Sequence, residues 1–290
     1  MIRRFPGLVR VTTVTVLLGL AAVLAACDVK VGEGGLSVDI ASGKAGDEWV
    51  RTYDLSPGGL LEIVNTNGPI EVRAAAGDRV EVRAVRALQW RSEAQAAEAL
   101  TQLRMEEVVE RDHVAIQARF ADASADATGR TPRLSVRYRV LVPKGLRVSV
   151  RTQNGGITLD GVDGTLVAAT TNGGVSGSSL SGAVDATVVN GGIRLHIASL
   201  TGDARLSSVN GGVLLELPST IAADIEATAV NGGVSIDDRL AGVGVRRDEG
   251  AGGPTRRLAA TLNGGGHKIA LSTTNGGVRV TARGEGPPRS

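Results

Sequence analysis

The tripeptide Asn-Gly-Gly occurs seven times in the second half of the chain, six of them with the same pattern of flanking residues, and this repetition limits what the chain can fold into. The six asparagines are Asn154, Asn172, Asn190, Asn210, Asn231 and Asn275. The first five are separated by 18, 18, 20 and 21 residues. A regular period of this size is typical of repeat proteins, in which each repeat is one supersecondary unit stacked on the next.

Each copy lies between two stretches in which apolar and polar residues alternate. Residues 184–188, before Asn190, read Val-Asp-Ala-Thr-Val, and residues 193–195 after it read Ile-Arg-Leu. Alternation with period two indicates a half-buried strand. Asn and Gly both tolerate positive φ, so Asn-Gly forms tight turns at little cost. Each repeat therefore predicts a strand, an Asn-Gly-Gly turn, a second strand and a second turn.

Two all-β architectures satisfy this pattern. In a β-solenoid each repeat is one coil, and equivalent turns stack about 4.8 Å apart. In an antiparallel meander, equivalent turns lie at roughly twice that distance. We favour a solenoid-like stack of two-stranded repeats, because the small inward residues Ala168, Ala186 and Ala227 suit a thin coil. Only this stack brings the asparagines close enough for a ladder of amide hydrogen bonds. The ladder is expected to follow chain order, from Asn172 through Asn190 and Asn210 to Asn231.

Residues 49–142 are predicted to form an N-terminal β region that begins with a degenerate repeat. Asn67 has apolar residues at the same offsets as the later asparagines, so we expect a structural turn there too. The Ala-rich segment 92–104 predicts one amphipathic helix with Ser92 as its N-cap. We expect this helix to cover one end or flank of the β-structure, the alternative being a partner-binding or membrane-surface helix.

Residues 143–283 are predicted to be the repeat region, followed by a disordered tail at 284–290. The segment 241–257 is rich in Gly and charge and is expected to be a surface loop. Asn263 is out of phase, because its apolar neighbours occupy odd offsets. We expect it to form a turn of a different kind, so that Asn190→Ala costs more stability than Asn263→Ala.

The first 27 residues have the pattern of a lipoprotein signal peptide. Three arginines precede the apolar run 11–26, which ends in Leu-Ala-Ala followed by Cys27, the single cysteine of the chain. This ending resembles the bacterial lipobox, which implies that Cys27 becomes the N-terminus and carries acyl chains such as palmitate. A plain membrane-spanning anchor is the alternative, but the apolar run is short for one. Residues 28–48 are expected to be a flexible tether.

The charge balance argues against a nucleic-acid partner. The sequence pI near 9.0 depends on the three arginines of the first 27 residues. Without them the chain has 29 basic and 30 acidic residues and is close to neutral. Nucleic-acid binding is driven by a basic surface, and the composition provides no such excess.

Three segments of the sequence resemble those of a known protein family. Residues 55–60 read Leu-Ser-Pro-Gly-Gly-Leu, and residues 65–72 read Asn-Thr-Asn-Gly-Pro-Ile-Glu-Val. This order resembles the entry signature of the bacterial putative-adhesin domains, β-strand-repeat proteins of unknown function. The closing segment 273–278, Thr-Thr-Asn-Gly-Gly-Val, fits as well, so the resemblance covers about residues 49–281. It implies a β-solenoid-like fold on the cell envelope and no catalytic residues.

Metal chemistry finds little support in the sequence. His113, His196 and His267 are far apart, His196 is expected to point outward, and a zinc site needs converging ligands. Calcium-binding repeats need Asp at one fixed place in every coil. The sixth position after each asparagine instead holds, in order, Asp160, Ser178, His196, Glu216 and Asp237. No metal or cofactor is therefore expected.

The main enzymatic alternative is a glycan-active β-helix enzyme acting on envelope or extracellular polysaccharide. Asp185 and Glu226 share one offset, but Arg205 lies between them, and no aromatic residue follows Tyr138 to serve as a sugar platform. We therefore expect a non-enzymatic lipoprotein of the cell envelope, held at the membrane by the lipid on Cys27. It would act as an adhesin-like scaffold or binding surface for an envelope or surface partner that the sequence does not identify.

Overall fold

The computed structural model describes residues 43–120, 131–240, 246–249 and 255–283, of which 246–249 are described as backbone only. Within these residues it has twenty strands and one helix. The predicted signal peptide 1–27 with Cys27, the tether up to residue 42 and the tail 284–290 lie outside the described residues, as do 241–245 and 250–254 of the predicted loop.

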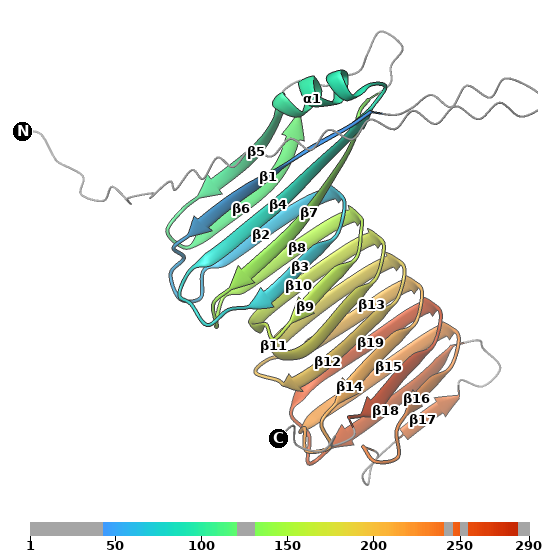
Figure 1. Cartoon of the computed structure of the whole chain (residues 1–290). Coiled ribbons are helices and arrows are strands. Elements are labelled where there is room, and N and C mark those ends of the chain that lie inside the picture. Colours follow the sequence, from blue (N-terminus) through green and yellow to red (C-terminus); the bar gives the residue numbers. More distant parts are fainter. Residues whose placement is uncertain (1–42, 121–130, 241–245, 250–254, 284–290) are drawn as a thin grey trace, which may run out of the picture. The chain divides into compact units, whose positions relative to one another are not determined.

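The strands form one hydrogen-bonded sheet that curls into two layers (Figure 1). Strand β11 joins the layers, because its first part pairs with β12 and its last part with β13. The first layer contains, in spatial order, β1 (Gly43–Tyr53), β4 (Val80–Trp90), β7 (Arg133–Val142), β3 (Ile70–Ala74), β9 (Ile157–Asp160), β11 (Val175–Asn190), β12 (Ile193–Ser199), β14 (Val213–Leu217), β20 (Val278–Ala282) and β16 (Val234–Ile236).

The second layer continues from the last part of β11 in both directions. Its other strands are, in spatial order, β5 (Leu103–Val109), β6 (His113–Phe120), β2 (Leu60–Asn67), β8 (Arg147–Asn154), β10 (Asp163–Asn172), then beyond β11 β13 (Ala204–Asn210), β19 (His267–Asn275), β15 (Ala223–Asn231), β18 (Arg256–Leu262) and β17 (Arg246–Glu249).

Equivalent strands of neighbouring coils run parallel and in register. Asn172 lies opposite Asn190, and Asn190 lies opposite Asn210. A meander would pair neighbouring strands antiparallel, so the stack is solenoid-like. Antiparallel pairs occur at the two ends, where β4 pairs with β1 and β7, and β18 with β15 and β17.

The order of the coils departs from the order of the chain, and here the prediction was wrong. Asn210 lies opposite Asn275, and Asn275 lies opposite Asn231, so the last coil sits between the coils of Asn210 and Asn231. The reason is β18, which pairs antiparallel with one edge of β15 and leaves the other edge for β19. β17 and β18 also replace part of the predicted loop 241–257 with strand.

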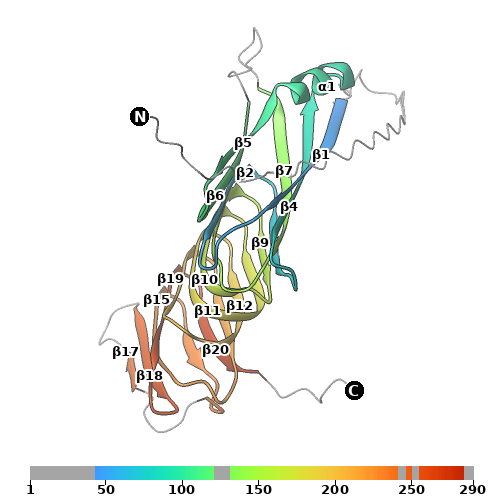
Figure 2. The ribbon, with the colours of Figure 1, turned by 90° about the vertical axis from the view of Figure 1, so that its left-hand side faces the viewer.

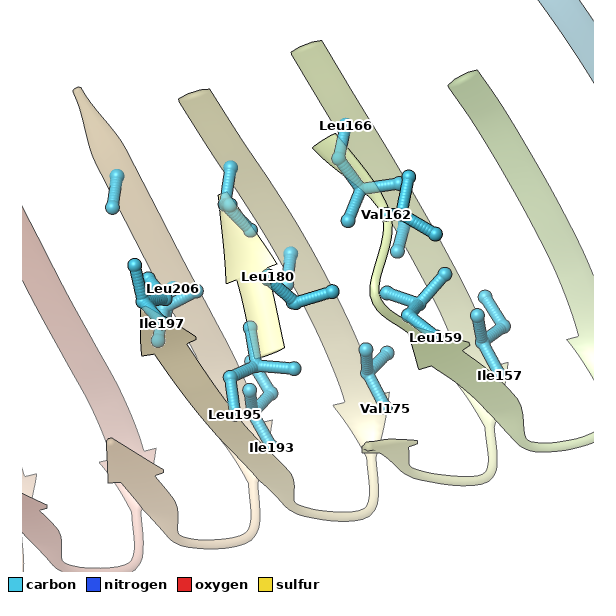
Figure 3. Close-up of a cluster of buried hydrophobic side chains, with 14 of the residues drawn as sticks. Ile157, Leu159, Val162, Leu166, Val175, Leu180, Ile193, Leu195, Ile197 and Leu206 are labelled. Carbon is cyan, nitrogen blue, oxygen red and sulfur yellow. The ribbon is translucent and has the colours of Figure 1, made fainter. Parts of the chain in front are cut away.

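The core consists of every second residue of each coil, pointing between the layers. In Figure 3, Ile157, Val175 and Ile193 occupy equivalent positions on successive strands, each at most 2% exposed. Burial of one such side chain contributes about 1.5–3 kcal/mol, and the pattern recurs in every coil. Ala168, Ala186 and Ala227 are buried as expected.

Two predicted boundaries were wrong, both because strand pairing extends further than the local pattern. The helix α1 spans Glu93–Thr101, with Ser92 as its N-cap, and contacts β1, β4 and β5 (Figure 2). Its predicted end at residue 104 is wrong, because Leu103 is buried and pairs with Phe120 in β5 and β6. Residues 43–48 of the predicted tether belong to β1, which pairs along its length with β4.

Candidate functional site

Seven asparagines form one column along the turns that join the two layers. In each step the Nδ2 of one asparagine donates to the Oδ1 of the asparagine before it in the column, over 2.7–2.9 Å. The order is Asn67, Asn154, Asn172, Asn190, Asn210, Asn275 and Asn231. The side chains are exposed, apart from the half-buried Asn67, so this ladder faces water rather than the core.

The first glycine of each copy explains why the coils can approach so closely. Gly191 has a φ of +147°, and a Cβ there would lie 2.0 Å from the carbonyl oxygen of Gly173. Thr170 Oγ1 donates to the Gly155 oxygen over 2.8 Å, so the turn carbonyl of a neighbouring coil is satisfied. Asn190 itself does not have positive φ, and among the described non-glycine residues only Ser179 and Asn263 do.

The second glycine of each copy borders an open groove on the outer face of the first layer. This glycine groove has a volume of about 800 Å³ and crosses six coils. Its walls carry the residue two positions after each second glycine. In spatial order these are Thr158, Ser176, Arg194, Leu214, Arg279 and Ser235. Arg194 and Arg279 are exposed, and they are the charged side chains among the residues that line it.

A second hollow adjoins the glycine groove and shares Thr158, Ser176 and Arg194 with it. His196 lies in this hollow, where Arg283 Nη1 is 2.6 Å from its Nδ1 and the Ser179 N–H donates to the same nitrogen over 3.1 Å. Burial and the neighbouring Arg283 lower the pKa of His196, while Glu216 opposes them. We expected His196 to point outward, and it lies in this hollow beside outer-face residues, but it is only 8% exposed because Arg283 covers it.

The residues at the sixth position after each asparagine, which calcium-binding repeats would fill with Asp, differ in their side chains and in their contacts. Ser178 Oγ donates to Asp160 Oδ1 over 2.6 Å, and His196 pairs across the strands with Glu216. Hydrogen bonds from Arg239 hold the pKa of Asp237 well below its usual range. His113 and His267 lie on other strands, beside Glu62 and Asp203 respectively. In the described ranges no three His, Cys, Asp or Glu side chains gather to hold a metal ion.

The two acids of the glycan-enzyme alternative are too far apart to act together. β11, β13, β19 and β15 are consecutive neighbours, so Asp185 and Glu226 are three strands apart. At about 4.8 Å per strand this is about 14 Å. The paired carboxylates of glycosidases lie about 5–9.5 Å apart. This arrangement does not favour glycoside hydrolysis by that pair.

Asn263, outside the ladder, has a more specific role than the sequence indicated. Its Nδ2 donates to the carbonyl oxygens of Ser219 and Ile221 over 2.9 and 2.8 Å, and its φ is +48°. Asn263 therefore ties the turn before β19 to the loop before β15. These hydrogen bonds argue against the expectation that Asn263→Ala costs less stability than Asn190→Ala.

The described part of the chain contains no helix long and apolar enough to cross a membrane. The glycine groove and the Arg283–His196 contact were both missed by the sequence reasoning. The sequence did contain a signal for the groove, because the fourth residue after each asparagine lines it. That Arg194 and Arg279 lie close together, however, depends on the order of the coils, which the sequence did not reveal.

Comparison with known proteins places the chain in a family. The family model described as Toastrack DUF4097 matches residues 61–281. Among solved structures, the chain is similar to a putative cell adhesion protein from Clostridium sporogenes, with 10% identity, coverage of 82% of this chain and 100% of that chain, and a TM-score of 0.46. It is also similar to a putative adhesin from Bacteroides fragilis, with 9% identity, coverage of 82% and 97%, and a TM-score of 0.23.

A third solved structure is a putative lipid binding protein from Parabacteroides distasonis, with 10% identity, coverage of 82% of this chain and 97% of that chain, and a TM-score of 0.28. None of the curated protein sequences matches the chain. The family model spans well over half of the sequence, and its all-β, solenoid-like fold is the one described above. This protein therefore belongs to the Toastrack DUF4097 family.

Proposed function

We propose that this protein is a non-enzymatic protein of the cell envelope whose repeat sheet serves as an adhesin-like scaffold or binding surface. The observation that supports this most is the glycine groove, which crosses six coils and presents hydroxyl, apolar and arginine side chains to solvent. Such a surface can bind an extended partner. The separation of Asp185 from Glu226 weakens the alternative of a glycan-active enzyme.

A turnover assay tests the non-enzymatic part of this proposal. The purified chain should leave a panel of polysaccharides and peptidoglycan intact. Reproducible cleavage that is lost in Asp185→Asn or Glu226→Gln would decide for the enzyme instead. Cross-linking and pull-down from an envelope extract should capture a partner, and a matched sample without the protein is the control.

We also propose that the protein is held at the membrane by acyl chains on Cys27. The support is the lipobox-like Leu-Ala-Ala-Cys and the absence of any other cysteine from the sequence. Several acyl chains give stable anchoring where one would be marginal. Cys27→Ser should move the protein from the membrane fraction to the soluble fraction and change its mobility. Unchanged membrane partition at unchanged mobility would exclude lipid attachment.

Finally, we propose that one Asn-Gly-Gly copy with its two flanking strands, about 20 residues, is the repeat unit of the fold. The support is the in-register pairing of Asn172 with Asn190 and of Asn190 with Asn210. Deletion of residues 190–209 would bring Asn172 next to Asn210 and should leave a folded, shorter stack. Deletion of residues 190–199 should not, because it breaks the register of the coil.

A further inference from the structure

We infer that the glycine groove is a binding site for an acidic linear polysaccharide, gripped by Arg194 and Arg279. The inference rests on the proposed function as a binding surface and adds the chemical class of the ligand. It starts from the shape of the groove. The second glycines have no side chain, so a chain-like ligand can lie across the strands close to the backbone of six consecutive coils.

The charge of the groove selects an anionic ligand. Arg194 pairs across the strands with Leu214, and Leu214 pairs with Arg279, so the two arginines lie on the same face two strands apart. At about 4.8 Å per strand they are about 10 Å apart. Among the described residues, no acidic side chain lines the groove. Within the described residues neither arginine has an ion-pair partner at 4.0 Å or less.

The adjoining hollow strengthens this positive field at one end. Arg194 belongs to both the groove and the hollow, and Arg283 lies in the hollow against His196. The lowered pKa of His196 favours the neutral form of its ring, so Arg283 is the main positive charge beside it. Glu216 offsets part of it. Arginine suits this role because its planar guanidinium can donate two hydrogen bonds to one carboxylate or sulfate group.

The remaining lining residues distinguish a polysaccharide from other polyanions. Thr158, Ser176 and Ser235 offer hydroxyl groups that can exchange hydrogen bonds with sugar hydroxyls. None of the described residues that line the groove is aromatic, so they cannot supply the base stacking that supports binding of single-stranded nucleic acid. An acidic peptide would gain most affinity by pairing its backbone with a free strand edge. β9, β12, β14 and β20 are paired on both sides, so along most of the groove a peptide finds no such edge. Among the described strands that line the groove, only β16, at its end, has a single partner.

Binding of defined polymers to the full-length protein in detergent tests the inference. Polygalacturonate is the acidic probe and dextran the neutral one, with polyglutamate and single-stranded DNA as the other polyanions. We expect polygalacturonate to bind and dextran not to bind. The double variant Arg194→Ala and Arg279→Ala should weaken binding at least tenfold. Binding should also weaken as ionic strength rises from about 0.1 M to about 1 M, where the Debye length falls from about 10 Å to about 3 Å.

Arg205→Ala is the matched control, because Arg205 is an exposed arginine on the outer face of the second layer. It should leave the affinity for polygalacturonate unchanged, and circular dichroism should show all variants folded. The inference is overturned if polygalacturonate does not bind, if the double variant binds as the parent does, or if polyglutamate or DNA binds equally well through the same arginines.

The same experiment separates this inference from the proposed function. If an envelope partner is still captured but the groove variants do not affect it, the ligand class is wrong and the binding-surface function stands. If polygalacturonate binds through the arginines but is shortened during the assay, the ligand class stands and the non-enzymatic function is wrong.

Discussion

Replacing Asn263 by Ala should destabilise the protein more than replacing Asn190 in the middle of the ladder. Asn263 Nδ2 makes two hydrogen bonds, to the carbonyl oxygens of Ser219 and Ile221, the second of them partly buried. At about 1 kcal/mol each, their loss costs about 2 kcal/mol. Alanine at a φ of +48° adds about 1–2 kcal/mol of backbone strain, which asparagine tolerates better. The expected loss in the free energy of unfolding is about 3–4 kcal/mol.

Asn190→Ala removes two ladder bonds, to Asn172 and Asn210, but these bonds face water. The amides left without a partner can bind water instead, so the desolvation penalty of a buried orphan group does not arise. Asn190 does not have positive φ, so alanine adds no backbone strain there. We therefore expect a loss of about 1 kcal/mol.

Urea unfolding followed by far-ultraviolet circular dichroism, in a chain beginning at residue 28, measures both losses. Circular dichroism reports on the whole sheet, whereas Trp49 and Trp90 lie in β1 and β4 at the N-terminal end, far along the stack from Asn263. Asn263→Gly should recover part of the loss, since glycine adopts positive φ without strain. An Asn190→Ala loss equal to or greater than that of Asn263→Ala would refute this reasoning and give the ladder the larger role.

Three further predictions follow from the turns and the hollow. Gly191→Ala should lower the free energy of unfolding by about 3 kcal/mol or more. Gly233→Ala is the control, because a Cβ there would meet nothing within 4 Å, and it should change stability by less than about 0.5 kcal/mol. Equal losses for the two variants in chemical denaturation would contradict the packing argument. Thr170→Val should cost about 1–3 kcal/mol by leaving the Gly155 carbonyl without its donor, and a neutral result would show that water replaces the hydroxyl. The lowered pKa of His196 means that the unfolded chain takes up the proton more readily, so stability should fall as the pH drops below about 6.5. His196→Gln should flatten that fall, and an unchanged pH profile would exclude His196 as its cause.

Local patterns in the sequence predicted the elements well and their order poorly. The alternation around Asn190 and the buried alanines belong to strands as expected, and the family resemblance is confirmed. Asn210, however, could stack on Asn231 or on Asn275, because both present the same motif. The choice depends on contacts distant in sequence. Leu258 and Leu262 carried a signal, since their out-of-phase alternation belongs to the antiparallel strand β18.

The candidate site was less predictable because it is assembled from residues far apart in the chain. Arg194 and Arg279 share a groove only because the last coil lies beside the coil of Asn210. His196 looked exposed from its place in the strand, and the residue that covers it, Arg283, follows it by 87 positions. Periodicity reports which face a side chain occupies, and it carries no information on what reaches over that face from another coil.

Because of the order of the coils, the coil of Asn231 is synthesised before the coil that separates it from the coil of Asn210. The coil of Asn231 is complete at Ile236, but its neighbour in the stack ends only at Ala282. At about 5–20 residues per second, these roughly 45 residues take about 2–9 s to appear. During that interval β13 and β14 have unpaired edges, and β15 carries the same turn motif as the strand that belongs there. Docking of β15 on β13 in chain order would form a plausible but wrong stack. The last coil must then displace the coil of Asn231 from β13. The antiparallel pairing of β18 with β15 favours the native arrangement.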